Sequence, residues 1–195
     1  MAEARPTDII VTEAYELSRD YIAYVTGRAS GTAPTPTAHA LRHAGDELLE
    51  KFPIFFKRWP RIFSGVTEDT ACDLLIQTID DNLMDFFERQ KRQTGYQPDI
   101  PWSMVLSIYV LAGQMAIYCQ EHGMEKALEP LAERVGRYVE ENICPAIKKK
   151  DGWAGFTERY GKKANMEGKV LKMCSIVLVT LSALLLSYFL WKRRI

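Results

Sequence analysis

The sequence is poor in the residue types that build metal sites. It has 195 residues, of which only three are histidines and four are cysteines. The cysteines are widely separated and form no CxxC pair: Cys72, Cys119, Cys144 and Cys174. A structural zinc site needs four such ligands at characteristic spacing. His39 and His43 stand one helical turn apart without a third ligand, so the pattern favours surface histidines and predicts no metal centre.

The sequence also lacks the short motifs that carry nucleotide binding and covalent catalysis. It contains no GxGxxG, no GxxxxGK[ST] and no GxSxG. The backbone signatures of a phosphate cradle and of a nucleophile elbow are therefore missing. The acid pairs Asp80–Asp81 and Glu140–Glu141 fall on predicted helices, where neighbours point about 100° apart and do not converge on one substrate. We predict a protein that is not an enzyme and needs no cofactor.

The charges are unevenly distributed along the chain. The sequence has 25 basic and 25 acidic residues, but residues 172–195 contain four basic residues and no acidic one. The rest of the chain is mildly acidic and lacks the basic surface that binds nucleic acid. The first eight residues, MAEARPTD, have no apolar run typical of a signal peptide. We expect a cytosolic domain with reduced cysteines.

A long uncharged run stands at the end of the sequence. Residues 173–191, MCSIVLVTLSALLLSYFLW, contain no charge and are bracketed by lysines and arginines. As a helix they span roughly 28 Å, close to the hydrocarbon core of a bilayer. We predict a C-terminal transmembrane helix within a tail anchor over residues 169–195; the alternative is a buried terminal helix. Five residues mark the predicted span: Met173, Leu178, Leu184, Phe189 and Trp191.

The preceding residues, 1–168, show helical periodicity. Apolar residues recur at three- and four-residue spacing in five segments: 7–25, 38–52, 68–91, 125–143 and a short one near 153–160. A small, polar, proline-containing loop is expected over about residues 28–37. Alternation of period two covers no full strand length. The pattern predicts one all-α domain, a helical bundle.

A second uncharged run lies inside this domain. Residues 102–120, WSMVLSIYVLAGQMAIYCQ, are apolar on all sides of a helix. Ser103, Ser107 and Gln114 make this run less lipophilic than the terminal one, and polar helices precede and follow it. We predict a central core helix covered by amphipathic neighbours; the alternative is a transmembrane hairpin.

One amphipathic helix carries a specific pattern. Within residues 40–52, ALRHAGDELLEKF, apolar positions surround a small residue and an acid. The chain here resembles the B-cell lymphoma 2 family of apoptosis regulators, whose third homology motif reads Leu, three residues, Gly-Asp. Five residues match that motif: Leu41, Ala44, Gly45, Asp46 and Leu48. The motif's remaining apolar anchor falls on Thr37, which is polar.

The order of the other motifs makes the resemblance specific. Residues 151–161, DGWAGFTERYG, are similar to the family's second motif, with Gly152, Trp153, Phe156 and Tyr160 at its spacing. Residues 15–27 are similar to the first helix and fourth motif, and the terminal run is similar to the family's tail. The resemblance covers nearly the whole chain. It implies a bundle around a central hydrophobic helix, with a surface groove beside it.

The first motif departs from the family pattern. Where the family has Asn-Trp-Gly-Arg, residues 101–104 of this chain read PWSM. The resemblance implies that the Arg donates a charge-assisted hydrogen bond to an Asp of a bound helix, and Met104 has no donor. Arg89 or Arg92 is a candidate replacement, and Trp102 is expected to wedge the floor of the groove. The expected groove residues are Phe86, Phe87, Trp102, Ser103, Met104, Val105 and Leu106.

The resemblance implies one of two functions. A survival-promoting member binds amphipathic death-motif helices of its pro-apoptotic relatives, and the second and third motifs look more like that branch. An effector resembling Bax, Bak or Bok instead exposes its own third-motif helix, oligomerises and permeabilises the mitochondrial outer membrane. Either would sit on the mitochondrial outer membrane or the endoplasmic reticulum with its domain in the cytosol, as a monomer or as a homo- or heterodimer. A membrane tether without a role in cell death is a third possibility.

Overall fold

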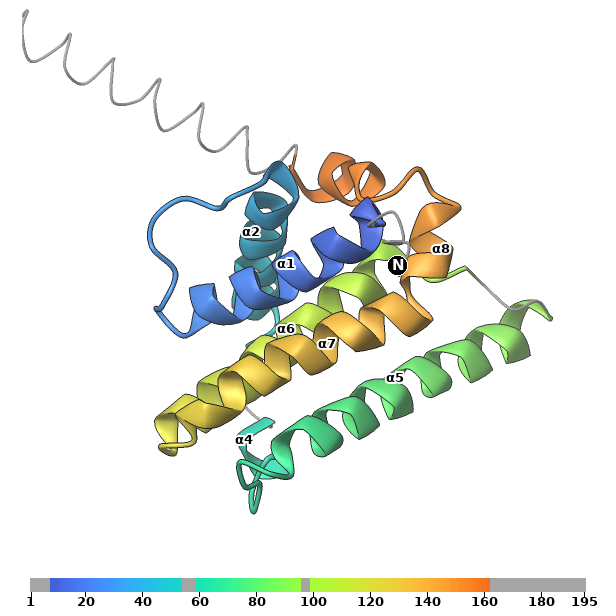
Figure 1. Ribbon diagram of the computed structural model, residues 1–195. Coiled ribbons are helices and arrows are strands. Elements are labelled where there is room, and N and C mark those ends of the chain that lie inside the picture. Colours follow the sequence, from blue (N-terminus) through green and yellow to red (C-terminus); the bar gives the residue numbers. More distant parts are fainter. Residues whose placement is uncertain (1–7, 54–58, 96–98, 162–195) are drawn as a thin grey trace, which may run out of the picture.

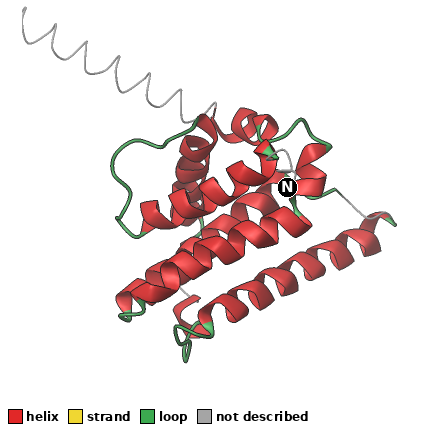
Figure 2. Cartoon of the chain, viewed as in Figure 1, coloured by secondary structure: helices red, strands yellow, loops and turns green. Residues whose placement is uncertain are grey.

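Helix α6 (Trp102–Glu121) runs through the middle of the computed structural model, and other helices pack around it (Figure 1). The structure describes residues 8–53, 59–95 and 99–161. The predicted tail anchor, with Met173, Leu178, Leu184, Phe189 and Trp191, lies outside these residues. None of the described residues forms a strand (Figure 2). The predicted all-α bundle is therefore confirmed.

The amino-acid sequence of α6 explains its central place. Eleven of its residues are buried, including Val105, Tyr109 and Met115 at 1% exposure or less. Among the described residues it is the one helix long and apolar enough to span a bilayer. A helix that is apolar all round must be covered by other helices when it stands inside a domain in water. Its burial agrees with the predicted core helix.

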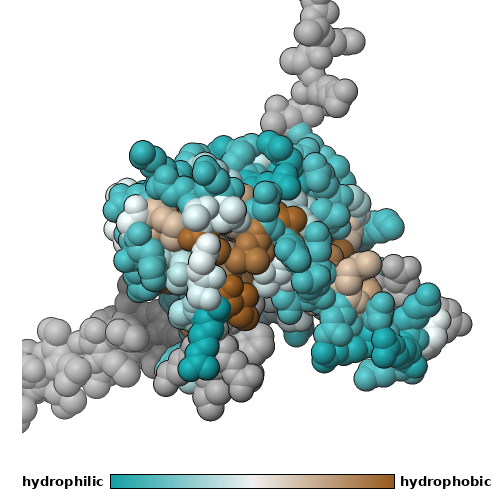
Figure 3. Space-filling view, turned by 90° about the horizontal axis from the view of Figure 1, so that it is seen from below, coloured by the Kyte–Doolittle hydropathy of each residue, from teal (hydrophilic) through white to brown (hydrophobic). Residues whose placement is uncertain are grey.

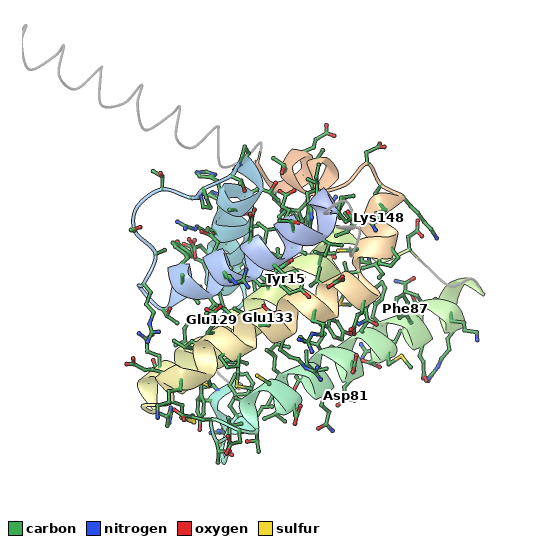
Figure 4. The ribbon with its side chains drawn as sticks, in the orientation of Figure 1. Tyr15, Asp81, Phe87, Glu129, Glu133 and Lys148 are labelled. Atoms are coloured by element: carbon green, nitrogen blue, oxygen red, sulfur yellow. The ribbon has the colours of Figure 1, made fainter. Side chains whose placement is uncertain are left out.

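Helix α1 (Ile9–Val25) packs most extensively on α7 (Leu128–Asn142). Asp8 caps α1 by accepting a hydrogen bond from the Ile10 backbone N–H at 3.1 Å. Tyr15 lies against Gly136, where any side chain would collide: a Cβ there would stand 2.4 Å from the tyrosine ring. Figure 4 shows Tyr15 on α1 beside Glu133 on α7. The glycine thus sets how closely the two helices approach.

Helix α2 (Pro36–Lys51) contains the third-motif residues. Thr35 caps it, since its Oγ1 accepts a hydrogen bond from the Ala38 backbone N–H at 3.1 Å. Pro36 occupies the first turn, where the missing N–H costs nothing. The helix therefore includes the last two residues of the loop predicted over residues 28–37. The loop is shorter because the sequence Thr-Pro is itself a helix start.

The other described elements complete the cover over α6. Helix α5 (Ala71–Thr94) packs on α6 and α7, and ends at Gly95, whose φ of 73° favours glycine. Three short elements are α4 (Trp59–Ile62), η1 (Glu125–Ala127) and α8 (Cys144–Lys148). A helical segment over residues 154–161 follows. Helices thus stand where the sequence predicts them, with boundary shifts of a few residues.

The second motif closes one end of the bundle. Trp153 is 3% exposed and its Nε1 donates to the Ile10 carbonyl oxygen at 3.0 Å. Its ring also lies 6.4 Å from that of Trp102, and Phe156 stands 5.8 Å from Trp102. Tyr160 packs on Phe156 at 4.8 Å, and Gly152 adopts a φ of 70° in the turn before them. Trp102 therefore belongs to this aromatic cluster.

Tyr21 of α1 is wedged between two glycines of neighbouring helices. Its ring is 1% exposed. A Cβ built at Gly45 of α2 would stand 2.2 Å from the tyrosine hydroxyl oxygen, and one at Gly113 of α6 would stand 2.8 Å from the ring. The small residue of the third motif therefore has a packing reason here: it lets α2 and α6 close on the same aromatic ring from two sides.

Substituting Gly45→Ala tests this wedge. The added methyl group has no room beside a buried, rigid ring, so we expect a loss of about 1–3 kcal/mol in the free energy of unfolding. The Tyr21 hydroxyl has no hydrogen-bond partner among the described residues, so Tyr21→Phe is expected to be neutral or stabilising. In the Tyr21→Phe background, Gly45→Ala should lower the free energy of unfolding by less than it does in the wild type, because the hydroxyl that collides with the new methyl group is gone. Denaturant unfolding of all four proteins measures this coupling; equal costs in both backgrounds would contradict the wedge.

Candidate functional site: an apolar groove beside the central helix

A groove of about 330 Å³ opens where α2, α5 and α6 meet. The end of α2 supplies Leu48, and Phe52, the residue that caps this helix, is 56% exposed beside it. The other lining residues come from α5 and α6: Ile79, Asn82, Ser103, Met104, Ser107, Ile108, Val110 and Leu111. On the face seen in Figure 3, apolar side chains gather in the middle of an otherwise polar surface. At the groove, part of α6 is left uncovered.

Among the residues that the structure describes, those that line the groove carry no charge. Met104 lies in the wall at the position where the family pattern expects an Arg. The candidate replacements do not take its place: Arg89 forms an ion pair with Asp85, and Arg92 with Glu88 at 2.7 Å, each on the exposed surface of α5. Neither arginine lines the groove. The described site is thus apolar with a few neutral polar groups.

The predicted groove residues separate into two groups. Ser103 and Met104 line the groove, as expected. Val105 and Leu106 are 1% and 4% exposed and face the core. Trp102, expected in the floor, instead packs on the second motif. One residue along a helix turns a side chain by about 100°, which places positions 102 and 106 opposite the face of Met104.

Phe86 and Phe87 also lie away from the groove lining. Their rings contact each other at 5.6 Å, half-buried on α5, and Phe87 packs against the core. Helix position alone suggested them. The residues that α5 does contribute, Ile79 and Asn82, are one turn apart. A clearer signal was present on the central helix, where 104, 107, 108 and 111 have the spacing of one helical face.

The third-motif residues lie on two sides of α2. Leu41 is fully buried, and Ala44 and Gly45 are buried with it against the bundle. Leu48 points toward the groove. Asp46 is exposed, and its Oδ2 accepts a hydrogen bond from the Tyr24 hydroxyl at 2.6 Å. This bond to a carboxylate raises the pKa of Tyr24 to about 12. The carboxylate of the third motif therefore has a hydrogen-bond partner within the same chain.

A second polar contact fixes α2 to α1. The Arg42 Nε and Nη2 donate to the two carboxylate oxygens of Asp20 at 2.9 and 2.6 Å. Both side chains are only about a tenth exposed. The Arg42 Nη1 donates to the Gly31 carbonyl oxygen of the preceding loop, and the guanidinium lies 4.7 Å from the Tyr24 ring centroid. We call Asp20, Tyr24, Arg42 and Asp46 the α1–α2 latch.

Comparison with known families decides what kind of domain this is. A family model described as "Apoptosis regulator proteins, Bcl-2 family" matches residues 41–153, more than half of the chain. The chain belongs to the Bcl-2 family. The match begins within the third motif and reaches the second, so it spans α2, the groove and α6. The resemblance drawn from the motifs is thereby confirmed.

Known Bcl-2 proteins of two kinds are similar to this chain. The Bcl-2-related ovarian killer protein of Gallus gallus is 25% identical over 161 residues, covering 78% of this chain and 73% of the relative. The crystal structure of chicken BOK aligns with a TM-score of 0.62 at 23% identity, covering 79% of this chain and 98% of that one. The zebrafish pro-survival protein NRZ, in a complex with Bad BH3, aligns with a TM-score of 0.63 at 20% identity, covering 77% and 94%. These structures share the fold.

Substituting Arg42→Ala tests the latch of this Bcl-2 domain. The change leaves the nearly buried Asp20 carboxylate without its partner, so we expect a loss of about 3 kcal/mol in the free energy of unfolding. Arg19→Ala is the matched control, because Arg19 pairs with Glu129 and Glu133 in solvent and should lose at most about 1 kcal/mol. Chemical unfolding of the two variants gives both values. Similar losses would show that the latch is an ordinary surface pair.

Proposed function

We propose that this Bcl-2 protein binds the amphipathic third-motif helices of pro-apoptotic relatives in its groove, and so inhibits membrane permeabilisation. The apolar groove between α2, α5 and α6 is the observation that carries the proposal. An amphipathic helix presents apolar side chains at positions i, i+3 or i+4, and i+7, which an apolar groove can receive. The complex of zebrafish NRZ with Bad BH3 has the same fold, which supports this class of partner.

The α1–α2 latch supports the role of a receiver. A protein that donates its third-motif helix must first expose the apolar face of that helix. Here Leu41 is fully buried, Arg42 is paired with Asp20, and Asp46 is bonded to Tyr24. Releasing α2 would break both polar contacts and expose Leu41 to water, which costs free energy. In this structure the groove is open, while α2 is held against α1 by these contacts.

A second candidate function is that of a pore-forming effector. The similar chicken protein carries the name ovarian killer, and α6 has the length and composition of a membrane-spanning helix. An effector of this kind would release α2, expose Leu41 and insert α6 into the membrane. The two functions differ in what the protein does to a membrane by itself.

We further propose that the tail anchor over residues 169–195 holds the protein on the mitochondrial outer membrane or the endoplasmic reticulum. These residues lie outside the described part of the chain, so the support is the uncharged span 173–191 with basic residues at both ends. With this anchor, the groove would face the cytosol and meet helices on other anchored proteins.

Dye release from liposomes with the lipids of the mitochondrial outer membrane separates the two functions. The full-length protein alone should release little dye, and it should reduce the release caused by activated Bax. Leu111→Glu is the matched variant, because it places a charge in the groove wall and should remove the inhibition.

Other outcomes of the dye-release assay point elsewhere. Release by the protein alone would identify the effector and contradict the proposed inhibition. If the protein released no dye by itself and left Bax-driven release unchanged, the result would favour a tether without a role in cell death.

Deletion of residues 170–195 tests the anchor. The truncated protein should move from the membrane fraction to the soluble fraction, because the uncharged span is gone, while its helical circular dichroism and melting temperature stay unchanged. Carbonate extraction of membranes from cells that express each form gives the distribution. A truncated protein that resists carbonate extraction would show that another part of the chain holds the membrane.

A further inference from the structure

A cavity of about 950 Å³ lies apart from the groove. It is bordered by the start of α1, the start of α2 and the helical segment over residues 154–161, which Figure 1 shows side by side. No described residue lines both this cavity and the groove. The binding of death-motif helices, as proposed above, therefore leaves the cavity without a role.

Apolar side chains are exposed in the lining of this cavity. Ile9, in the first turn of α1, is 80% exposed, and Pro36 and Ala154 are also exposed there. Covering an exposed isoleucine with another apolar side chain removes hydrocarbon surface from water, which is favourable. The lining therefore favours an occupant that carries at least one apolar side chain.

Among the described residues, the charged groups of the lining are all carboxylates. Glu13 and Glu16 come from α1, and Glu158 comes from the segment over residues 154–161. Glu13 and Glu16 stand three residues apart on one helix, and neither forms an ion pair with another described residue. Like charges at this spacing repel each other, and a cation beside them lowers that energy. The lining therefore favours a basic occupant.

The chain leaves the described domain at this cavity. Gly161, the last described residue, lies in the cavity wall. The next eight residues, 162–169, read KKANMEGK and contain three lysines, one glutamate and the apolar Met166. Lys162 and Lys163 directly follow the wall residue, and the whole segment can extend by at most about 26–29 Å. Its composition complements the cavity in both charge and hydrophobicity.

We propose that residues 162–169 dock in this cavity, with lysine ammonium groups beside Glu13 and Glu16 and the Met166 side chain against Ile9. The covalent tether raises the effective concentration of the segment to the order of millimolar, so weak contacts are sufficient. The inference does not depend on which helices the groove binds. Docking shortens the link between the domain and the predicted anchor, which limits the orientations of the groove at the membrane.

Methyl NMR of the full-length protein in detergent micelles tests the docking. The protein is labelled at the methionine methyl and isoleucine δ1 methyl groups, so that Met166 reports on the segment and Ile9 on the cavity. A nuclear Overhauser effect arises only between methyl groups that lie a few ångströms apart. We expect such an effect between Met166 and Ile9 in the wild type. Its absence would overturn the inference.

Two double variants test the role of the carboxylates. Glu13→Gln/Glu16→Gln removes two charges from the cavity and should weaken the Overhauser effect and shift the Met166 signal, because the lysines lose their partners. Glu129→Gln/Glu133→Gln is the matched control, because it removes two charges from α7, outside the cavity (Figure 4). It should leave both observables unchanged. If the two double variants changed the Met166 signal equally, or if neither changed it, the proposed contact would be wrong.

The same approach identifies other occupants. In a mixture of methionine-labelled and isoleucine-labelled protein, an Overhauser effect between Met166 and Ile9 would come from two different copies and would overturn docking within one chain. If the cavity variant shifted the Met1 signal in place of Met166, residues 1–7 would be the occupant and the proposal would be wrong. Binding of the Bad BH3 peptide is followed separately at Met104, so docking and groove binding can fail independently.

Discussion

The burial of one uncharged helix governs the architecture of this domain. Because α6 has no polar side, every face of it that meets water costs free energy. Helices α1, α2, α5 and α7 each cover part of it. The cover is incomplete where the end of α2 passes α5, and there Met104, Ser107 and Leu111 line a groove. The proposed binding site is thus the gap left by the packing that buries α6.

Close contacts hold α2 against α1 and α6. Tyr21 fits between Gly45 and Gly113, which lets α2 lie close to α1 and α6 together. The pair of Arg42 with Asp20 and the bond of Tyr24 to Asp46 hold the polar side of α2. With its own helix fixed in this way, the domain presents an open groove to a helix from elsewhere. This arrangement supports the proposed role as a receiver of death-motif helices.

The sequence predicted the helices and the family better than it predicted the groove. Periodicity and the motifs around Gly45, Asp46 and Trp153 were enough for an all-α Bcl-2 bundle. Trp102, expected at the groove from motif matching, and Phe86 and Phe87, expected there from helix position, are absent from its lining. A motif match or a place on a helix identifies a residue without the direction of its side chain. The latch was missed for another reason: Asp20 and Arg42 are 22 residues apart, and no local pattern joins them.

The most direct test of the groove is methyl NMR of the full-length protein labelled at its methionines. Met104 lies in the groove wall, Met84 is exposed on α5, and Met115 is fully buried in α6. On addition of the Bad BH3 peptide, the account predicts a large shift of the Met104 methyl signal and little change at the other two. A shift at Met84 with none at Met104 would place the peptide on another surface and contradict the account.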